Sequence, residues 1–191
     1  MTAHPLVLPG PVPGVVEIGD DLIEVARAWP RGRRDDAEII LVEGRDRAGR
    51  VRAAQLRMRP GAGLGWQVTR VRVAPPGRDP RLPDLADAAH DGAVVVHRYG
   101  RRAVVRARDR YVKVVRPGAG PDIAAAASHG RDLARDAGFE APDVLEVGPG
   151  AVSFSILPGR SLHELGGVVT SGEWHRWWQR WAVRWCALAR P

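Results

Sequence analysis

The 191-residue sequence contains no asparagine, one lysine (Lys113) and one cysteine (Cys186). A lone cysteine excludes a disulfide framework and a thiolate zinc site, and it agrees with a reducing compartment. Without asparagine, these residues cannot complete a mechanism that needs an Asn ligand or donor. No run reaches the ~20 apolar residues of a membrane span, and the first residues lack the charged start and apolar core of a signal peptide. The sequence therefore predicts a cytoplasmic protein that holds no metal.

The charge balance is basic, because 29 lysine and arginine residues face 22 acids and give a formal net charge of +7. Acidic residues alternate with the arginines, as in residues 31–38 and 43–50. A basic surface favours phosphate, nucleotide or nucleic acid as a partner, but it specifies no fold. Aromatic residues are not interleaved with these basic stretches, so they match a nucleic-acid reader poorly.

Lys113 stands in an apolar run, YVKVV (residues 111–115), of a chain whose other strongly basic side chains are all arginine. A single retained lysine indicates a position that needs a compact ammonium rather than a planar guanidinium. The alternative is that Lys113 is a chance remnant of an arginine-favouring codon usage. Composition does not separate these two interpretations.

Residues 1–75 are predicted to form a β-rich amino-terminal extension. Four prolines in residues 1–14 favour an extended arm, whereas residues 15–29 are apolar-rich with a period that does not distinguish strand from helix. Runs at 38–43, 51–58 and 66–73 are separated by turn-rich segments, which predicts an antiparallel meander of three strands. Residues 76–90 follow as a proline-rich connection and a short helix at 84–90.

Residues 91–165 contain the order of three strands, one helix and two strands. The strands are predicted at 94–99, 103–107, 111–115, 144–147 and 152–157, and the helix runs to residue 137. Asp122 is the expected N-cap of this helix, and Gly138 ends it. The predicted fold class is therefore α+β, with a five-stranded antiparallel lobe and one main helix.

Residues 166–191 contain the Trp-rich segment SGEWHRWWQRWAVRWCALAR (171–190). Ser171 is expected to cap a helix that has Glu173 in its first turn. Five tryptophans share one face and three arginines another, so the helix is strongly amphipathic. These residues are Trp174, Trp177, Trp178, Trp181 and Trp185, with Arg176, Arg180 and Arg184. The aromatic face needs cover, from a further lobe, a second copy, a partner chain, a membrane surface or the amino-terminal sheet.

Four segments in this order resemble the amino-terminal lobe of one family of small-molecule kinases, the aminoglycoside phosphotransferase and choline-kinase-like family. They are GRRAVVR (100–106), YVKVVRPG (111–118), AGFEAPDVLEV (137–147) and SFSILPGRSLHEL (153–165). The resemblance implies a kinase-like fold and ATP binding for residues 91–165. The last segment is similar to the family's fifth strand and the hinge that follows it.

The resemblance also implies the residues of a nucleotide site. Lys113 would pair the α- and β-phosphates, as the third-strand lysine of kinase-like folds does. The turn at 99–102 would lie over the phosphates, and the residues after the fifth strand would line the adenine. The implied contacts are Gly100, Arg101, Arg102, Val104, Val114, Ser155, Ile156, Leu157 and Pro158.

Three departures from the family pattern bear on activity. The predicted helix has no Glu to fix Lys113, and only Asp132 and His129 lie at a suitable offset. Tyr111 shares the strand face of Lys113 and places a ring where adenine would enter. The family's catalytic Asp, its metal-binding Asn and its second Asp are absent, since no Asp or Asn follows Leu165. These residues are therefore expected to contain no catalytic residue, and magnesium would bind only with a catalytic lobe supplied elsewhere.

Two functions of different class follow. The first is the ATP-binding lobe of a small-molecule phosphotransferase, truncated before the catalytic lobe and inactive alone. Its partners would be a nucleotide and either a carboxy-terminal lobe in trans or a second copy joined through the Trp helix. The alternative is a basic, non-catalytic binding module for nucleic acid or a partner protein. The phosphate acceptor is not identified, because fold analogy does not name a substrate.

Overall fold

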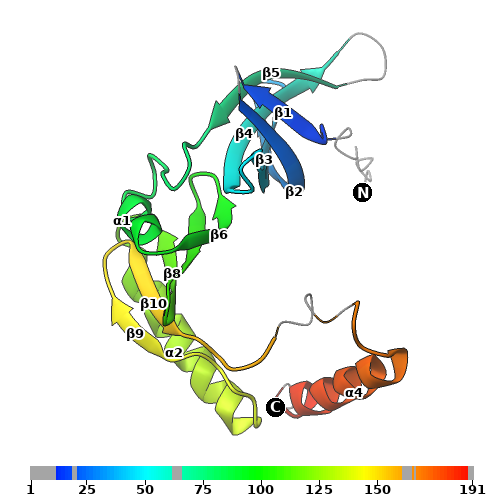
Figure 1. The fold of residues 1–191 in the computed structure, drawn as a ribbon, viewed down its shortest axis with the longest axis vertical. Helices are drawn as coiled ribbons and strands as arrows, with labels where there is room; N and C mark the ends of the chain where they lie inside the picture. The colour runs from blue at the N-terminus through cyan, green and yellow to red at the C-terminus, as the bar shows by residue number, and fades with distance from the viewer. Residues whose placement is uncertain (1–11, 19–20, 62–65, 161–164, 166, 189–191) are drawn as a thin grey trace, which may run out of the picture.

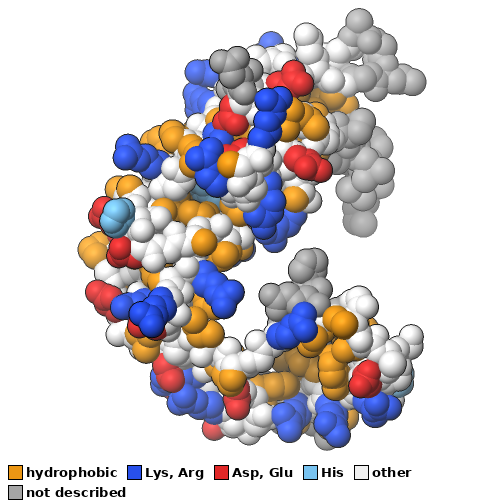
Figure 2. All heavy atoms as spheres, in the orientation of Figure 1, with side chains coloured by type: hydrophobic (Ala, Val, Ile, Leu, Met, Phe, Trp, Pro, Cys, Tyr) orange, Lys and Arg blue, Asp and Glu red, His pale blue; other side chains and the backbone are white. Residues whose placement is uncertain are grey.

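The computed structural model of the chain describes residues 12–18, 21–61, 66–160, 165 and 167–188. The fold is α+β, and the described part contains two five-stranded antiparallel sheets and three helices. Figure 1 shows the amino-terminal sheet, called sheet A, at one end of an open arc and the last helix at the other. The space-filling view shows a hollow between these two ends, with basic side chains on its rim (Figure 2).

Sheet A is a meander with the strand order β1-β2-β3-β4-β5. Its strands are β1 (Val15–Ile18), β2 (Asp21–Arg34), β3 (Ala37–Arg45), β4 (Val51–Pro60) and β5 (Trp66–Val73). The three predicted strands are therefore extended by two, which residues 15–34 supply. The period of those residues is unreadable because β2 shifts register between Val25 and Arg27 and again between Pro30 and Gly32. Residues 1–11, most of the predicted arm, lie outside the described residues.

The core of sheet A lies on one face of the curled sheet. Ile23, Val42 and Leu56 are fully buried there, and partly buried side chains from β2 and β5 pack against them. Glu43 and Arg52 are also buried, but each has a charged partner. The central strands are covered on the other face as well, because Leu41 and Ala53, which alternate with the residues of this core, are also buried.

Sheet B has the strand order β6-β7-β8-β10-β9, so the last strand inserts beside the third. Its elements are α1 (Leu85–His90), β6 (Ala93–Arg98), β7 (Arg102–Arg106), β8 (Arg110–Val115), α2 (Gly120–Asp136), β9 (Val144–Val147) and β10 (Ala151–Ser155). Leu85 of α1 packs against Val105 and Val114 on one face of the sheet. Helix α2 contacts β9 and β10.

Helix α2 begins three residues earlier than the sequence predicts. Asp122 is not the N-cap but an acidic residue of the first turn, and Ala119 flanks the helix instead. Pro121 in the first turn explains the earlier start, because proline fixes a helical φ where no amide bond is needed. Gly138 has a φ of +73° and follows the C-cap, as predicted for a helix ended by glycine.

The last helix, α4 (Ser171–Leu188), starts with a capping box rather than a serine cap. The Thr170 hydroxyl accepts a bond from the Glu173 amide at 3.3 Å, and Glu173 Oε2 accepts bonds from the Thr170 amide at 2.9 Å and the hydroxyl at 2.8 Å. These hydrogen bonds, the backbone one foremost, lower the pKa of Glu173. The predicted cap, Ser171, is instead the first helical residue.

The aromatic face of α4 turns toward α2 and not toward sheet A. Trp181 and Trp185 stack with ring centroids 5.4 Å apart and line an apolar cavity of about 510 Å³ with Leu133 and Phe139. Arg184 donates a 2.8 Å hydrogen bond to the Gly138 carbonyl. Trp181 is still 43 % exposed and Trp185 53 %. In the described part of the chain, no helix has the length and apolar character needed to cross a membrane.

Candidate functional site

Lys113 lies in the middle of sheet B. Its strand, β8, pairs with β7 and β10, and Lys113 is opposite Val104 on one side and Val152 on the other. The side chain is half-buried. Burial lowers the pKa of its ammonium group, and the charge of Arg102 lowers it further. No carboxylate of the described residues forms an ion pair with Lys113, so the sheet holds a cation that an added anion would stabilise.

The strand pairing places two of the expected contacts on the face of Lys113. Val104 is directly opposite Lys113, and Arg102 is two residues before it in β7, on the same face. Val114 is the next residue after Lys113, so it faces the other way and is fully buried against α1. A ligand on the face of Lys113 would therefore not contact Val114. Tyr111 shares the face of Lys113 by the same alternation.

Gly100 shapes the turn between β6 and β7, where its φ is +61°. Its amide donates a 2.6 Å hydrogen bond to Asp79 Oδ2. That carboxylate is fully buried and also bonds His97 Nε2 at 3.0 Å. The Gly100 amide thus ties the turn to Asp79 in the segment before α1, so it is not available to bind a phosphate oxygen. Arg101, beside it, is exposed to solvent.

The Asp79–His97 pair is a buried polar feature that the sequence reasoning missed. Burial acts to raise the pKa of Asp79, but hydrogen bonds from His97, the Gly100 amide and the Arg81 amide outweigh it, and the pKa is lowered. The only available signal was a histidine inside the apolar strand AVVVHR. Its partner lies 18 residues away in the proline-rich connection, which no local pattern indicates.

The segment after β10 is the other end of the expected nucleotide site. Ser155 is engaged with Asp143, because its amide donates to the Asp143 carbonyl at 2.9 Å and its hydroxyl accepts from the Asp143 amide at 2.8 Å. Ile156 is 36 % exposed and Leu157 39 % exposed, and Pro158 is exposed as well. An apolar strip on the surface is therefore available, whereas the Ser155 backbone amide is not. Residues 161–164, the end of the expected hinge, lie outside the described residues.

The two parts of the expected site lie at opposite ends of β8. Ser155 pairs with Arg110 at the start of the strand, and Arg102 pairs with Val115 at its end. Five residues of extended strand span ~17 Å. Lys113 lies between these ends, so an extended ligand that follows β8 would pass it.

Asp132 of α2 is not a partner of Lys113. It is exposed and forms a 2.9 Å ion pair with Arg131, which in turn reaches Asp143 at 3.1 Å. His129 is exposed as well. A glutamate is absent from α2, so the usual fixation of the family's lysine has no equivalent among the described residues.

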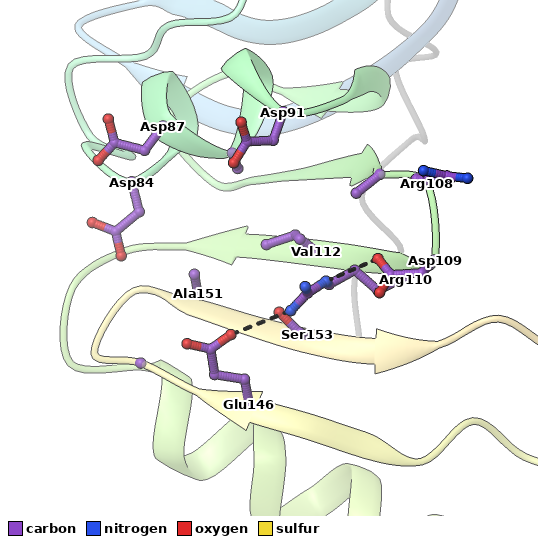
Figure 3. A pocket seen from close by; sticks show the side chains of 13 residues that line it. Asp84, Asp87, Asp91, Arg108, Asp109, Arg110, Val112, Glu146, Ala151 and Ser153 are labelled. Carbon is purple, nitrogen blue, oxygen red and sulfur yellow. Dashed lines mark hydrogen bonds and ion pairs between the residues drawn. The ribbon is translucent and has the colours of Figure 1, made fainter.

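An acidic cavity of about 530 Å³ lies on the face of sheet B opposite Lys113. Figure 3 shows Asp84, Asp87 and Asp91 from the α1 region at one end of the cavity and Glu146 of β9 at the other. Arg110 bridges Asp109 at 3.2 Å and Glu146 at 3.5 Å. No group of three metal-ligating side chains occurs among the residues that the structure describes. The excess of carboxylates makes this face unsuitable for a phosphate.

Searches against protein-family models, curated proteins and solved structures found no match to this chain.

Proposed function

We propose that residues 91–165 form the ATP-binding lobe of a small-molecule phosphotransferase, resembling the aminoglycoside phosphotransferase and choline-kinase-like family. One observation carries this proposal: the only lysine of the chain is half-buried in the middle of sheet B without an ion-pair partner among the described residues. A nucleotide phosphate would neutralise that charge where no side chain does.

The arrangement of the elements supports the proposal in two ways. The strands and α2 follow the order that the resemblance implies, and β10 lies directly beside the Lys113 strand. The two faces of sheet B also differ in charge, because the cavity lined by carboxylates is on the face opposite Lys113. An anionic ligand is therefore directed to the face that carries Lys113 and Arg102.

The proposed contacts follow from these positions. Lys113 and Arg102 bind phosphate oxygens, and Val104 supplies apolar contact beside them. Ile156, Leu157 and Pro158 form the surface on which the adenine lies. Gly100 shapes the turn, but its amide donates to Asp79 and not to the nucleotide. The Tyr111 ring narrows the space through which adenine would enter, so the nucleotide is expected to bind weakly.

Phosphoryl transfer needs groups that these 191 residues do not contain, since the family's metal-binding Asn has no counterpart in a sequence without asparagine. The proposed lobe therefore binds nucleotide without turning it over, unless a carboxy-terminal lobe in trans supplies the metal ligands. Magnesium would enter with that lobe. A cytoplasmic location fits this role and the single cysteine.

The test is thermal unfolding with and without millimolar ATP. Wild-type protein is expected to be stabilised by ATP, because the ligand binds only the folded state. Lys113→Met should abolish the shift, and Arg47→Gln, which removes one exposed positive charge from the β3–β4 turn, should keep it. An ATP shift that persists in Lys113→Met contradicts the proposed site.

The alternative, a basic module that binds nucleic acid, is favoured by the formal net charge of +7. It predicts salt-sensitive retention on single-stranded RNA that Lys113→Met leaves unchanged. RNA retention combined with no ATP shift would replace the nucleotide proposal with this one.

A further inference from the structure

Four arginines from four separate segments gather beside the turn at residues 99–102. Arg31 comes from β2 of sheet A, Arg81 from the segment before α1, Arg101 from the β6–β7 turn and Arg116 from the end of β8. We call these four residues the arginine cluster. All four side chains are exposed to solvent.

The backbone brings three of these arginines together. The Arg81 Cδ atom lies 2.9 Å from the place that a Cβ on Gly100 would take, so Arg81 covers the turn. Pairing of β7 with β8 ends at Arg102 opposite Val115, which makes Arg101 and Arg116 the next residues on two adjacent chains. Asp79 holds this arrangement, because its carboxylate accepts bonds from the Arg81 amide at 2.9 Å and from the Gly100 amide.

No member of the arginine cluster forms an ion pair with a carboxylate of the described residues. Arg31 donates one 3.3 Å hydrogen bond to Gln55, a neutral side chain. Burial lowers the pKa of the Arg31 guanidinium, and the charges of the other three arginines lower it further. The carboxylate of Asp79 is fully buried and already bonds His97, so it is not free to pair with them.

A folded chain that holds four positive charges together, with none of them in an ion pair within the described part of the chain, is destabilised by their repulsion. An anion would remove this cost. Guanidinium groups bind phosphate oxygens in pairs, and four of them match a ligand with several such oxygens better than one phosphate. Other arginines of the chain show the contrast, since Arg33 and Arg50 pair with Glu38 and Asp46 at 3.0 and 2.9 Å.

We propose that the arginine cluster is a binding site for a small anion with several linked phosphate groups, held between sheet A and sheet B. The site differs from the one at Lys113, because Arg116 follows Val115 and so lies beyond the strand pairing that contains Lys113. It also gives sheet A a role through Arg31. That residue follows Trp29 in β2, and the Trp29 ring centroid lies 4.5 Å from the guanidinium carbon of Arg98 at the end of β6. The proposal does not depend on ATP binding at Lys113.

The test is calorimetric titration of the full chain with tripolyphosphate at low salt, together with thermal unfolding. Wild type is expected to bind and to gain stability. The double variant Arg31→Gln/Arg116→Gln should bind at least about tenfold more weakly. Without ligand, it should be at least as stable as wild type, because it relieves repulsion. The control is a second double variant, Arg47→Gln/Arg108→Gln, which changes two other exposed arginines. It has the same net charge as Arg31→Gln/Arg116→Gln and should bind tripolyphosphate like wild type.

Separate outcomes decide the two proposals. Tripolyphosphate binding that survives Lys113→Met and is lost in Arg31→Gln/Arg116→Gln supports the second site, even if ATP has no effect. Equal binding by the double variant and its charge-matched control overturns it, even if the ATP shift at Lys113 is present. Retention on single-stranded RNA without binding of tripolyphosphate also overturns it, because the ligand would then be a nucleic acid.

Discussion

Lys113 is held half-buried between Val104 and Val152, and its environment lowers the pKa of the ammonium group. In the interval between that lowered pKa and the ordinary value of 10.5, the unfolded chain binds more protons than the folded chain. Stability therefore rises with pH across this interval. Arg102 contributes to the effect, because its like charge lowers the pKa of Lys113 further.

Replacing Lys113 with methionine is expected to raise stability at neutral pH by about 1 kcal/mol or less, because an ammonium without an acidic partner no longer has to be partly desolvated. The alkaline gain in stability should disappear in the same variant. Urea unfolding between pH 7 and 11 measures both effects. A clear loss of stability in Lys113→Met would mean that the ammonium has a stabilising partner within the chain.

Asp79 fixes the turn at Gly100 through a fully buried carboxylate. Its folded-state pKa is lowered, so its contribution is complete above the unfolded value of 3.8 and is lost as the pH falls through the folded value. Asp79→Asn should lower the free energy of unfolding by about 2–3 kcal/mol at pH 7. His97 and the two backbone amides would then face a neutral side-chain amide and no longer a carboxylate. Chemical unfolding from pH 7 to 2 checks this: wild type should approach the variant in acid, and parallel curves would count against it.

At the scale of elements, helix α4 depends on its capping box. Thr170→Val removes the hydroxyl that bonds both the Glu173 amide and its carboxylate, while keeping side-chain volume. Amide exchange in residues 171–188 is expected to become faster, with little change in sheet B. The cap should also fade in wild type as pH falls below 4.5 through the lowered pKa of Glu173. Unchanged exchange in the variant would show that packing on α2, not the cap, orders the helix.

Helix α2 requires glycine at its first residue. A Cβ on Gly120 would clash with the Gly148 carbonyl oxygen in the turn between β9 and β10. Gly120→Ala is therefore expected to destabilise the protein by about 2 kcal/mol, whereas alanine at Gly130, where the structure leaves open space, should be neutral or stabilising. Thermal unfolding compares the pair. Equal stability of the two variants would contradict this packing.

The sequence predicted regular elements better than irregular ones. Strand β5 has the predicted bounds, because residues 66–73 are set off by turn residues on both sides. Strands β1 and β2 were not separable, since the bulges at Val25–Arg27 and Pro30–Gly32 interrupt the alternation on which the prediction depends. The caps of α2 and α4 were each misplaced, because cap identity depends on backbone angles and tertiary contacts.

The candidate site was predictable only where it is local. Alternation within β8 places Tyr111 on the face of Lys113, and the same rule places Val114 on the opposite face. The buried Asp79–His97 pair and the arginine cluster depend on contacts between distant segments, so no pattern in the sequence indicates them. The kinase-like assignment itself remains a proposal that rests on the resemblance and on Lys113.

At the scale of the molecule, Glu43 joins the two sheets. Its Oε2 atom accepts a 2.6 Å hydrogen bond from the His97 amide of β6, and its Oε1 atom is bonded by the Arg27 guanidinium. Glu43→Gln is expected to cost about 2–3 kcal/mol and to weaken coupling between the sheets. Denaturant unfolding followed in sheet A and sheet B by amide exchange should then show two transitions. A single unchanged transition would mean that other contacts join the sheets.

Because Lys113 is the only lysine, a protein labelled with lysine carrying ¹³C at Cε gives one side-chain NMR signal. Titration with ATP is the most direct test of nucleotide binding at this residue. The proposal predicts a saturable shift of that signal and a rise in the measured pKa of the ammonium group toward its ordinary value, because bound phosphate favours the charged form. A signal that does not move at millimolar ATP, with its titration midpoint unchanged, would contradict the nucleotide site.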